Sequence, residues 1–292
     1  MPFVGKTEFG KVLAAKLRSQ LVVEGLFRRE YKGDALGVAV KTPMTTDDTL
    51  SADYDGSNIA NNTVSYLNND YVTTNINHHP FINKYIPGFN LTTASWDAKA
   101  GAVESASYSV AKKMNSDAIT VLINGAQGLN EAGTAFGSGD PRYGLTGHTV
   151  AYATDFYTTL AKMGGKLTDA GVPMEDRYAI VNGDGQALVL ASPLAVKYGQ
   201  DEQAINGGVI AELCGFKIKV SNLVTGTISS KKILAVCGHP DFGINPSDYE
   251  EEPTLVSGNF SQNTVGGVFV KALAHYAYDI SDPRAFGCIT EA

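Results

Sequence analysis

The most informative segment of the chain is TTASWDAKAGAVESASYSVAKKMNSDAITVLINGA, residues 92–126. Its apolar and small residues recur every three or four positions, which predicts one amphipathic helix. These positions are Trp96, Ala100, Val103, Ser107, Val110, Met114, Ala118 and Val121. Thr92 or Thr93 can cap the N-terminus of this helix, and the pair Asn124 and Gly125 predicts its end. The helix should have about seven to eight turns and be roughly 40 Å long, whereas the mean helix has about three turns. We therefore expect a structural spine in a chain that mixes helices and strands.

Upstream of this helix, the sequence predicts a long β-hairpin. Residues 33–43 alternate between apolar and polar, which is typical of a half-buried strand, and Pro43 should end it. The apolar positions are Leu36, Val38 and Val40. The polar segment 45–62 contains the turn pair Asp55 and Gly56, and residues 63–77 are rich in strand-forming Val, Thr, Tyr and Ile. A two-stranded ribbon is marginal by itself in water, so we expect this hairpin to lie on a partner.

Shorter elements are predicted along the rest of the chain. We expect an amphipathic helix or arm over about residues 8–27, and a second amphipathic helix over about residues 151–170 that ends at Gly171 and Pro173. Local composition predicts strands at RYAIVN and FKIKVSN, and a short helix at GDGQALVLA. Pro- and Asp-rich loops then lead to VFVKALAHYAYDI, whose alternating apolar residues predict a long strand. Periodicity alone leaves a helix open for this last segment.

Charge and composition narrow the classes of function. The formal net charge is -7 and the isoelectric point is about 5.2, which disfavours sequence-specific DNA binding because that needs Lys and Arg against phosphates. The three cysteines are widely spaced, so neither a disulfide framework nor a zinc ribbon is expected. The N-terminus lacks the apolar core of a signal peptide, and no apolar run reaches the ~18 residues that span a membrane. The acidic runs at residues 47–48 and 250–252 are expected to be solvated loops.

The sequence predicts no catalytic, cofactor-binding or metal-ligating residue. His78 and His79 are adjacent, and adjacent residues on a strand point to opposite faces, so they are poorly placed to share a metal ion. Cys237 and His239 are close in sequence, but no third group is available to orient them for nucleophilic catalysis. The Gly-rich segment 127–147 lacks the Gly-Lys-Ser/Thr of a phosphate-binding loop and is expected to be an ordinary loop.

Five segments, taken in order, carry a resemblance to a known family. They are LRSQLVVEGLFRREYKGDA (17–35), the helical segment 94–126, LAKMGGKLTDAGVPMEDRYAIVNGDGQALVLASP (160–193), GVIAELCGFKIKVSNLV (208–224) and YAYDISDPRAFGCIT (276–290). Together they resemble the N-terminal arm, spine helix, helix–strand–helix unit, Gly-Phe strand and closing strand of the major capsid proteins of tailed bacteriophages. The resemblance depends on the order of these five segments along the chain.

The resemblance implies an α+β fold of the HK-ninety-seven type. Its parts would be an N-terminal arm at residues 1–30, an extended hairpin loop at 31–90, the spine helix of a peripheral domain at 91–125, a mainly axial domain at 126–255, and closing strands shared by both domains at 256–292. It implies a major capsid protein that self-assembles as pentamers and hexamers into the icosahedral head shell enclosing phage double-stranded DNA. The partners implied are other copies of the chain, scaffolding, portal or decoration proteins, and packaged DNA without sequence-specific contacts. It implies no cofactor and no membrane, with assembly in the host cytoplasm and a final place in the virion.

The hairpin supplies the candidate contact residues between subunits. They are Leu50, Tyr54, Asp55, Ile59, Tyr66 and Tyr71. Some members of the family join their subunits by isopeptide bonds between a hairpin Lys and a neighbour's Asn, with help from a Glu. Residues 45–62 contain no Lys here, and Lys32, Lys41 and Lys84 lie nearer the base of the hairpin, so we expect a shell without covalent crosslinks.

Two alternatives to a phage capsid protein stay open from the sequence. The first is the shell of an encapsulin-like nanocompartment, which shares the fold and differs in enclosing cargo proteins. The second, less favoured, is an unrelated α/β enzyme that uses the Gly-rich loop. The size of the purified assembly separates a shell protein from such an enzyme.

Overall fold

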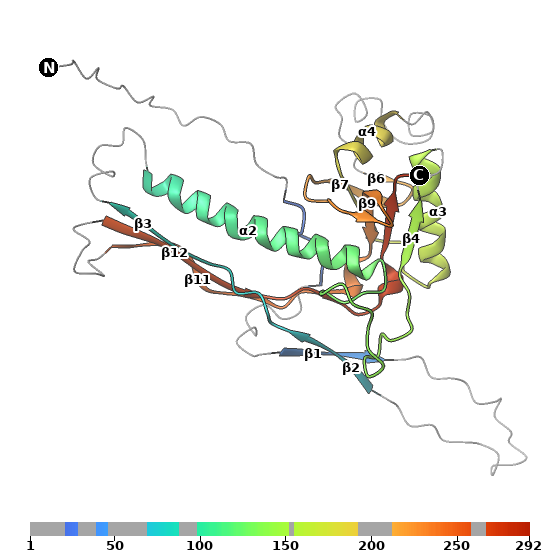
Figure 1. Ribbon diagram of the computed structural model, residues 1–292, viewed down its shortest axis with the longest axis horizontal. Coiled ribbons are helices and arrows are strands. Elements are labelled where there is room, and N and C mark those ends of the chain that lie inside the picture. Colours follow the sequence, from blue (N-terminus) through green and yellow to red (C-terminus); the bar gives the residue numbers. More distant parts are fainter. Residues whose placement is uncertain are drawn as a thin grey trace, which may run out of the picture.

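The computed structural model describes residues 21–28, 39–45, 69–87, 98–151, 155–191, 212–257 and 267–292. A long helix lies along a three-stranded sheet, and a compact body with a larger sheet sits at the C-terminal end of that helix (Figure 1). A separate two-stranded ribbon lies near the junction of these two parts. No helix among the described residues is both long and apolar enough to cross a membrane.

The long helix α2 spans Ala98–Gly125, 28 residues, and its predicted length and end are confirmed. Its predicted caps Thr92 and Thr93, and Trp96, lie outside the described residues. The apolar face is partly as expected, because Val110, Ala118 and Val121 are buried, but Ala100 and Ser107 are exposed. Burial is densest in the C-terminal half, where the helix enters the body and also buries Asn115, Ile119 and Leu122.

The sheet beside α2 has the antiparallel strand order β11-β12-β3. Strand β12 (Gly267–Tyr276) confirms the predicted alternation, since every second residue from Val268 to Tyr276 is buried. Ala272 and Ala274 of β12 pack with Val110 of α2, because small side chains let the helix approach the sheet closely.

Two strands of this sheet were not expected. Strand β3 (Phe81–Pro87) had no assignment, and β11 (Ser247–Ser257) falls where loops and a solvated acidic run were predicted. The loop prediction is wrong for residues 250–252. At a sheet edge, charged side chains such as Glu250 and Glu252 can stay exposed while the backbone pairs, and register shifts between Tyr249 and Thr254 accommodate them.

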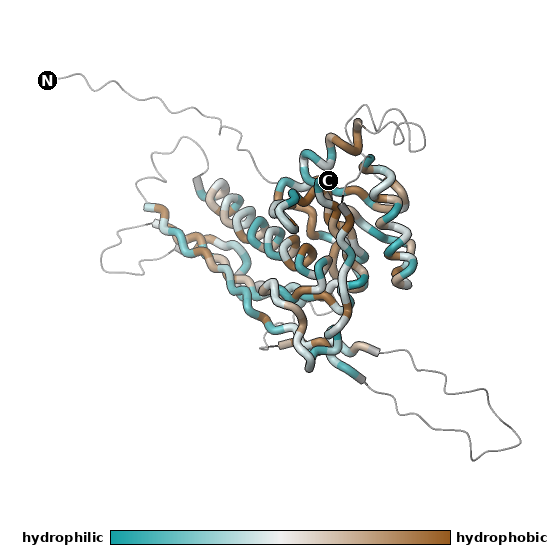
Figure 2. Tube along the Cα trace, turned by 45° about the vertical axis from the view of Figure 1, so that its right-hand side comes forward, coloured by the Kyte–Doolittle hydropathy of each residue, from teal (hydrophilic) through white to brown (hydrophobic). Residues whose placement is uncertain are grey.

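The body is built on a seven-stranded sheet of order β4-β14-β9-β5-β7-β6, with β8 also paired to β9. Its strands are β4 (His148–Ala151), β14 (Gly287–Thr290), β9 (Lys231–Gly238), β5 (Tyr178–Val181), β7 (Phe216–Val220), β6 (Glu212–Leu213) and β8 (Thr227–Ile228). Two of them, β5 and β7, confirm the strands predicted from sequence, whereas β9 had no assignment. Figure 2 shows hydrophobic segments gathered inside this body, where the main core cluster lies.

Among the described residues, two helices accompany the sheet of the body: α3 (Phe156–Asp169) and α4 (Gly183–Ala191), the latter as predicted. The expected start of α3 at residue 151 is wrong, because Ala151 ends strand β4 and Asp155 caps the helix by accepting a hydrogen bond from the Thr158 amide at 3.1 Å. The prediction that this helix is amphipathic is confirmed, because Phe156, Leu160 and Met163 are fully buried whereas Lys162 and Lys166 are not.

The ribbon pairs β1 (Ala39–Thr45) with β2 (Asn69–Asn75) in antiparallel register, from Ala39 opposite Asn75 to Thr45 opposite Asn69. The predicted hairpin is confirmed at its base, whereas its tip, residues 46–68, lies outside the described residues. Pro43 does not end the strand as expected. It lies within β1 opposite Tyr71, because a strand that pairs on one side only tolerates the missing amide hydrogen.

The described part of the predicted N-terminal helix or arm, residues 21–28, is an irregular segment with a turn, so the helix alternative is wrong there. Gly25 has φ +77°, a conformation that interrupts a right-handed helix. Leu26 and Phe27 are nonetheless buried, and the Arg28 amide donates to the carbonyl of Gly243 at 3.0 Å, which fastens the segment to the body. Short pieces complete the fold: β10 (Gly243–Ile244) pairs with β13 (Asp279–Ile280), and 3-10 turns span Pro240–Phe242 and Pro283–Ala285.

Candidate functional site

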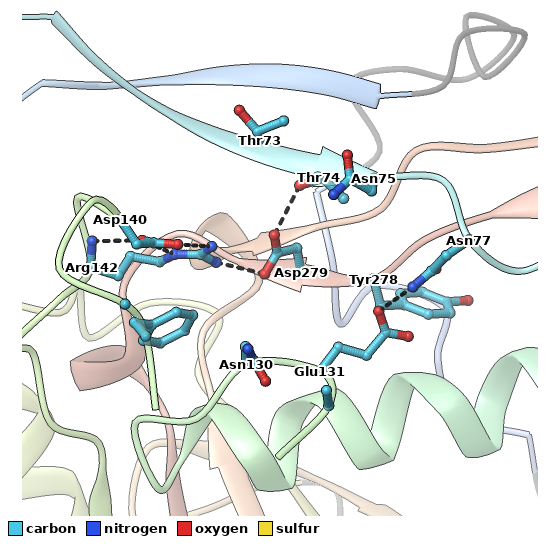
Figure 3. A pocket seen from close by; sticks show the side chains of 13 residues that line it. Thr73, Thr74, Asn75, Asn77, Asn130, Glu131, Asp140, Arg142, Tyr278 and Asp279 are labelled. Carbon is cyan, nitrogen blue, oxygen red and sulfur yellow. Dashed lines mark hydrogen bonds and ion pairs between the residues drawn. The ribbon is translucent and has the colours of Figure 1, made fainter. Parts of the chain in front are cut away.

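The base of the hairpin is the candidate functional site, because it fixes how the projecting ribbon is held by the rest of the molecule. A hollow of about 340 Å³ lies there between β2, the Gly-rich loop and the segment between β12 and β13 (Figure 3). Its lining is mostly polar: Thr73, Thr74, Asn75, Asn77, Asn130, Glu131, Ala132, Phe136, Gly137, Asp140, Arg142, Tyr278 and Asp279.

Arg142 organises this site from the Gly-rich loop. Its guanidinium donates two bonds of 2.8 Å to the carboxylate of Asp140, through Nε and one terminal nitrogen. The other terminal nitrogen donates to Asp279 Oδ1 at 2.6 Å and to the carbonyl oxygen of Ile280. The ring of Phe136 lies 4.3 Å below the guanidinium carbon, a cation–π contact. The side chain is only 5% exposed, so its charge is neutralised almost wholly by these groups.

Asp279 joins this arginine to the hairpin. Its Oδ2 accepts a hydrogen bond from Thr74 Oγ1 of β2 at 3.2 Å, as Figure 3 shows. Burial raises the pKa of Asp279, and the attraction of Arg142 offsets part of that effect. Asp140 is more exposed; burial would raise its pKa, but the hydrogen bonds from Arg142 outweigh burial and lower it. The ribbon is thus tied to the body through one buried ionic network.

A second attachment follows directly after β2. The amide of Asn77 donates to Glu131 Oε2 at 2.8 Å, and His78 Nε2 bonds to the other oxygen of the same carboxylate. The His78 ring stacks on Tyr276 with centroids 5.1 Å apart, and the Tyr276 hydroxyl donates to Asp117 of α2 at 2.7 Å. This chain of contacts links the exit of the ribbon to the long helix.

The contact between His78 and Glu131 shifts the pKa of both side chains. The hydrogen bond to Glu131 raises the pKa of His78 in spite of its partial burial. Burial would raise the pKa of Glu131, but the hydrogen bonds from His78 and Asn77 lower it overall. Both groups are therefore held in their charged forms near pH 6.

His79 points away from this network, as strand alternation predicted for adjacent residues. Its Nδ1 lies 2.6 Å from Nδ1 of His275 on β12, and Nε2 of His275 lies 2.7 Å from Glu250 of β11. Within the described ranges, no group of three or more His, Cys, Asp or Glu side chains is arranged to hold a metal ion.

The other side chains considered for catalysis, Cys237 and His239, lie in surroundings that fit a structural role. Burial raises the pKa of the fully buried Cys237 thiol, which disfavours the nucleophilic thiolate. His239 lies at the start of a 3-10 turn, where its Nδ1 accepts from the Asp241 amide and its Nε2 contacts the Glu175 carbonyl at 2.8 Å. The Gly-rich loop is a loop, as predicted, and it carries Glu131, Asp140 and Arg142 into the site just described.

Of the six contact residues predicted from sequence, only Tyr71 lies among the described residues. Tyr71 lies on β2 and is 50% exposed. The other five, Leu50, Tyr54, Asp55, Ile59 and Tyr66, lie outside the described residues. The sequence analysis did not identify the residues at the base of the hairpin. The Asp-x-Arg pattern that occurs at residues 140–142 and again at 282–284 was a signal in the sequence that included Asp140 and Arg142.

Comparison with known proteins shows which solved structures share this architecture. No protein-family model and no curated protein matches the chain. A chain from Mycobacterium phage Che8 superposes with a TM-score of 0.74 at 17% identity, covering 99% of this chain and 97% of that one. The capsid structure of the cyanophage P-SCSP1u gives a TM-score of 0.73 at 12% identity, covering 99% and 93%. The chain has the phage capsid fold.

A further match shows that the likeness extends through the whole chain. The capsid of a native GTA particle gives a TM-score of 0.70 at 12% identity, covering 99% of this chain and 96% of that one. The predicted α+β fold of the HK-ninety-seven type is confirmed, and α2 is the helix predicted as its spine.

Proposed function

We propose that this protein is the major capsid protein of a tailed bacteriophage, which self-assembles into the icosahedral head shell around double-stranded DNA. The observation that carries the proposal is the structural match over 99% of the chain to capsid structures of a cyanophage and of a GTA particle. The role is structural, and the protein acts in the virion after assembly in the host cytoplasm.

The hairpin is the proposed intersubunit arm. A ribbon with so little core of its own gains stability from lying on another surface. The buried Arg142–Asp279–Thr74 network supports this role, because it fixes the direction in which the ribbon leaves the body. Leu50, Tyr54, Asp55, Ile59, Tyr66 and Tyr71 are the proposed contact residues on a neighbouring subunit.

The division into parts follows from the same proposal. The arm is residues 1–30, the extended loop 31–90, the spine helix 91–125, the mainly axial domain 126–255 and the shared closing strands 256–292. The partners are other copies of the chain in pentamers and hexamers, together with scaffolding, portal or decoration proteins. Packaged DNA is enclosed without specific contacts, which suits a chain of net charge -7.

Deletion of residues 46–62 tests this proposal. The deleted variant should stay folded, because the contacts that hold the ribbon to the body, such as Thr74 to Asp279, lie outside the deleted residues, but it should no longer form shells or capsomers. Sedimentation velocity gives the size, and circular dichroism checks the fold. Normal shells from the deletion variant would remove the hairpin from its proposed role, and a small oligomer from the intact chain would favour the enzyme alternative.

A further inference from the structure

The joint between the hairpin and the sheet beside α2 is a short connection, residues 76–80, that leads from β2 into β3 (Figure 1). Its backbone is paired with β12. The amide of His78 donates to the carbonyl of Tyr276 at 3.2 Å, and the Tyr276 amide donates back at 3.1 Å. The Ala274 amide donates to the carbonyl of Pro80 at 3.2 Å. Movement of the ribbon against the sheet therefore depends on how firmly this joint is held.

Two side-chain contacts hold the joint, one on each face. On the face toward α2, His78 bonds to Glu131 as described above. On the outer face, His79 Nδ1 lies 2.6 Å from Nδ1 of His275, and the two rings meet edge to face with centroids 4.8 Å apart. Nε2 of His275 lies 2.7 Å from the carboxylate of Glu250. Adjacent histidines thus fasten the same joint to different partners.

The contact between the two Nδ1 atoms can hold only one proton. An imidazole nitrogen either carries a hydrogen and donates, or lacks one and accepts. His275 fits the role of acceptor, because a hydrogen on its Nε2 can be donated to Glu250 and leaves its Nδ1 without one. His79 then donates from Nδ1, and its Nε2 can take up a further proton without disturbing the contact. When both rings are protonated, both Nδ1 atoms carry hydrogen, so the bond is lost and two like charges face each other.

The charged groups around this pair come mainly from β11. Glu250 contacts His275 directly, and Asp248 lies opposite His275 in the strand register. On β12, Lys271 is four residues from His275, about 13 Å along the strand. The carboxylate that bonds to His78 lies on the other face of the joint. The carboxylates of β11 therefore compensate one positive charge on the pair, whereas a second proton enters beside the first and requires acidic conditions.

We propose that His79 and His275 form a proton-operated clasp, which holds the outer face of the joint at neutral pH and opens when both imidazoles are protonated. The contact between His78 and Glu131 depends on pH in the opposite sense, because it is strongest with His78 protonated. Acid thus moves the hold on the joint from its outer face to its inner face, and the ribbon can then tilt about the inner contact. The clasp lies within one subunit, so its test does not depend on the assembly proposed above.

Hydrogen exchange of the full-length protein, followed by mass spectrometry, measures the opening of the joint. The amides of Ala274 and Tyr276 bond to carbonyls on either side of His79, so their protection factors report on it. Between pH 8 and pH 5 their protection should fall about fivefold, the factor expected for the loss of one hydrogen bond. The Asn182 amide, which donates to the Leu234 carbonyl in the body, is the reference and should not fall with them.

His79→Asn removes the proton dependence and keeps the contact. A carboxamide can donate to Nδ1 of His275 or accept from it, so the bond survives in either form of that imidazole. Protection of the two amides should then no longer fall toward pH 5, whereas His79→Ala should lower it at both pH values. His148→Gln removes a histidine of the body and should leave the fivefold fall unchanged. An equal fall in the intact protein and in His79→Asn, or no fall in the intact protein, would overturn the proposal.

Discussion

At the residue scale, the most consequential side chain is the buried Arg142. Two carboxylates and a backbone carbonyl surround it, and an aromatic ring covers one face. The same Asp-x-Arg arrangement recurs at Asp282 and Arg284, where the arginine is 47% exposed. The two arginines thus differ in burial and not in their type of partner. The buried Arg142 contact holds the hairpin, whereas the exposed Arg284 contact adds little to stability.

Replacing Arg142 with Ala should lower the free energy of unfolding by about 3–5 kcal/mol, because it leaves Asp279 buried beside Asp140 without its cation. Arg284→Ala, the matched exposed variant, should cost less than about 1 kcal/mol. Urea denaturation of both variants measures the difference. Equal losses would show that the Arg142 network adds no more than a surface ion pair.

The His78–Glu131 contact predicts a pH dependence of stability. The folded pKa of His78 lies above its ordinary 6.5, so its contribution is fully present below pH 6.5 and is lost as the pH rises through the folded value. The folded pKa of Glu131 lies below its ordinary 4.5, so its contribution is present above pH 4.5 and is lost as the pH falls through the folded value. The pair should stabilise most between these limits.

Denaturation of the intact protein and of His78→Gln across pH 4 to 9 checks this window. The stability difference between the two should be largest near pH 5–6 and should shrink toward pH 9. His148→Gln is the control, because burial lowers the pKa of His148. The contribution of His148 to stability should therefore decrease as the pH falls below neutral, opposite to that of His78. A difference for His78→Gln that grows toward pH 9 would contradict the assigned direction.

At the element scale, the regular elements with strong periodicity could be predicted and the others could not. Helix α2 and strand β12 follow repeats of about 3.6 and 2 residues over many positions, so their existence could be read from the sequence. Strand β11 could not be predicted, because its acidic residues are exposed at the edge of the sheet and leave no apolar repeat in the sequence. The hairpin base could not either, since Thr74 and Asp279 are 205 positions apart.

The contact between α2 and β12 predicts the effect of a buried charge. Val110 is 2% exposed and packs with Ala272 and Ala274, so Val110→Asp places a carboxylate where no described group can pair with it. We expect insoluble protein on expression, whereas Lys112→Asp on the exposed side of the same helix should remain soluble. Val103 is only half buried and makes a weaker test than its place in the sequence pattern predicted. Soluble, stable Val110→Asp protein would refute the assigned face.

At the scale of the whole molecule, an extended shape is combined with a single well-packed body. The hairpin and the α2 sheet expose backbone edges and apolar side chains, among them Phe81 at 75% and Tyr71 at 50% exposure. Monomeric proteins usually bury such edges, and an assembly can cover them. The capsid fold therefore accounts for features that would be liabilities in an isolated chain.

The distribution of lysines predicts how the assembled shell is held together. Crosslinking by isopeptide bonds needs an amine within about 3–3.5 Å of a carboxamide. The hairpin tip at residues 45–62 has no Lys. Lys41 lies on β1 of the ribbon, whereas Lys84 lies on β3, in the sheet beside α2 instead of on the ribbon. On a denaturing gel, mature particles should give one band near 30.9 kDa. A ladder of multimers that survives boiling would show covalent crosslinks.

Electron microscopy of the purified full-length protein tests the central claim most directly. If the chain is a major capsid protein, the images should contain closed shells of icosahedral outline, or rings of five and six subunits. A uniform population of monomers or small oligomers without such rings would contradict it.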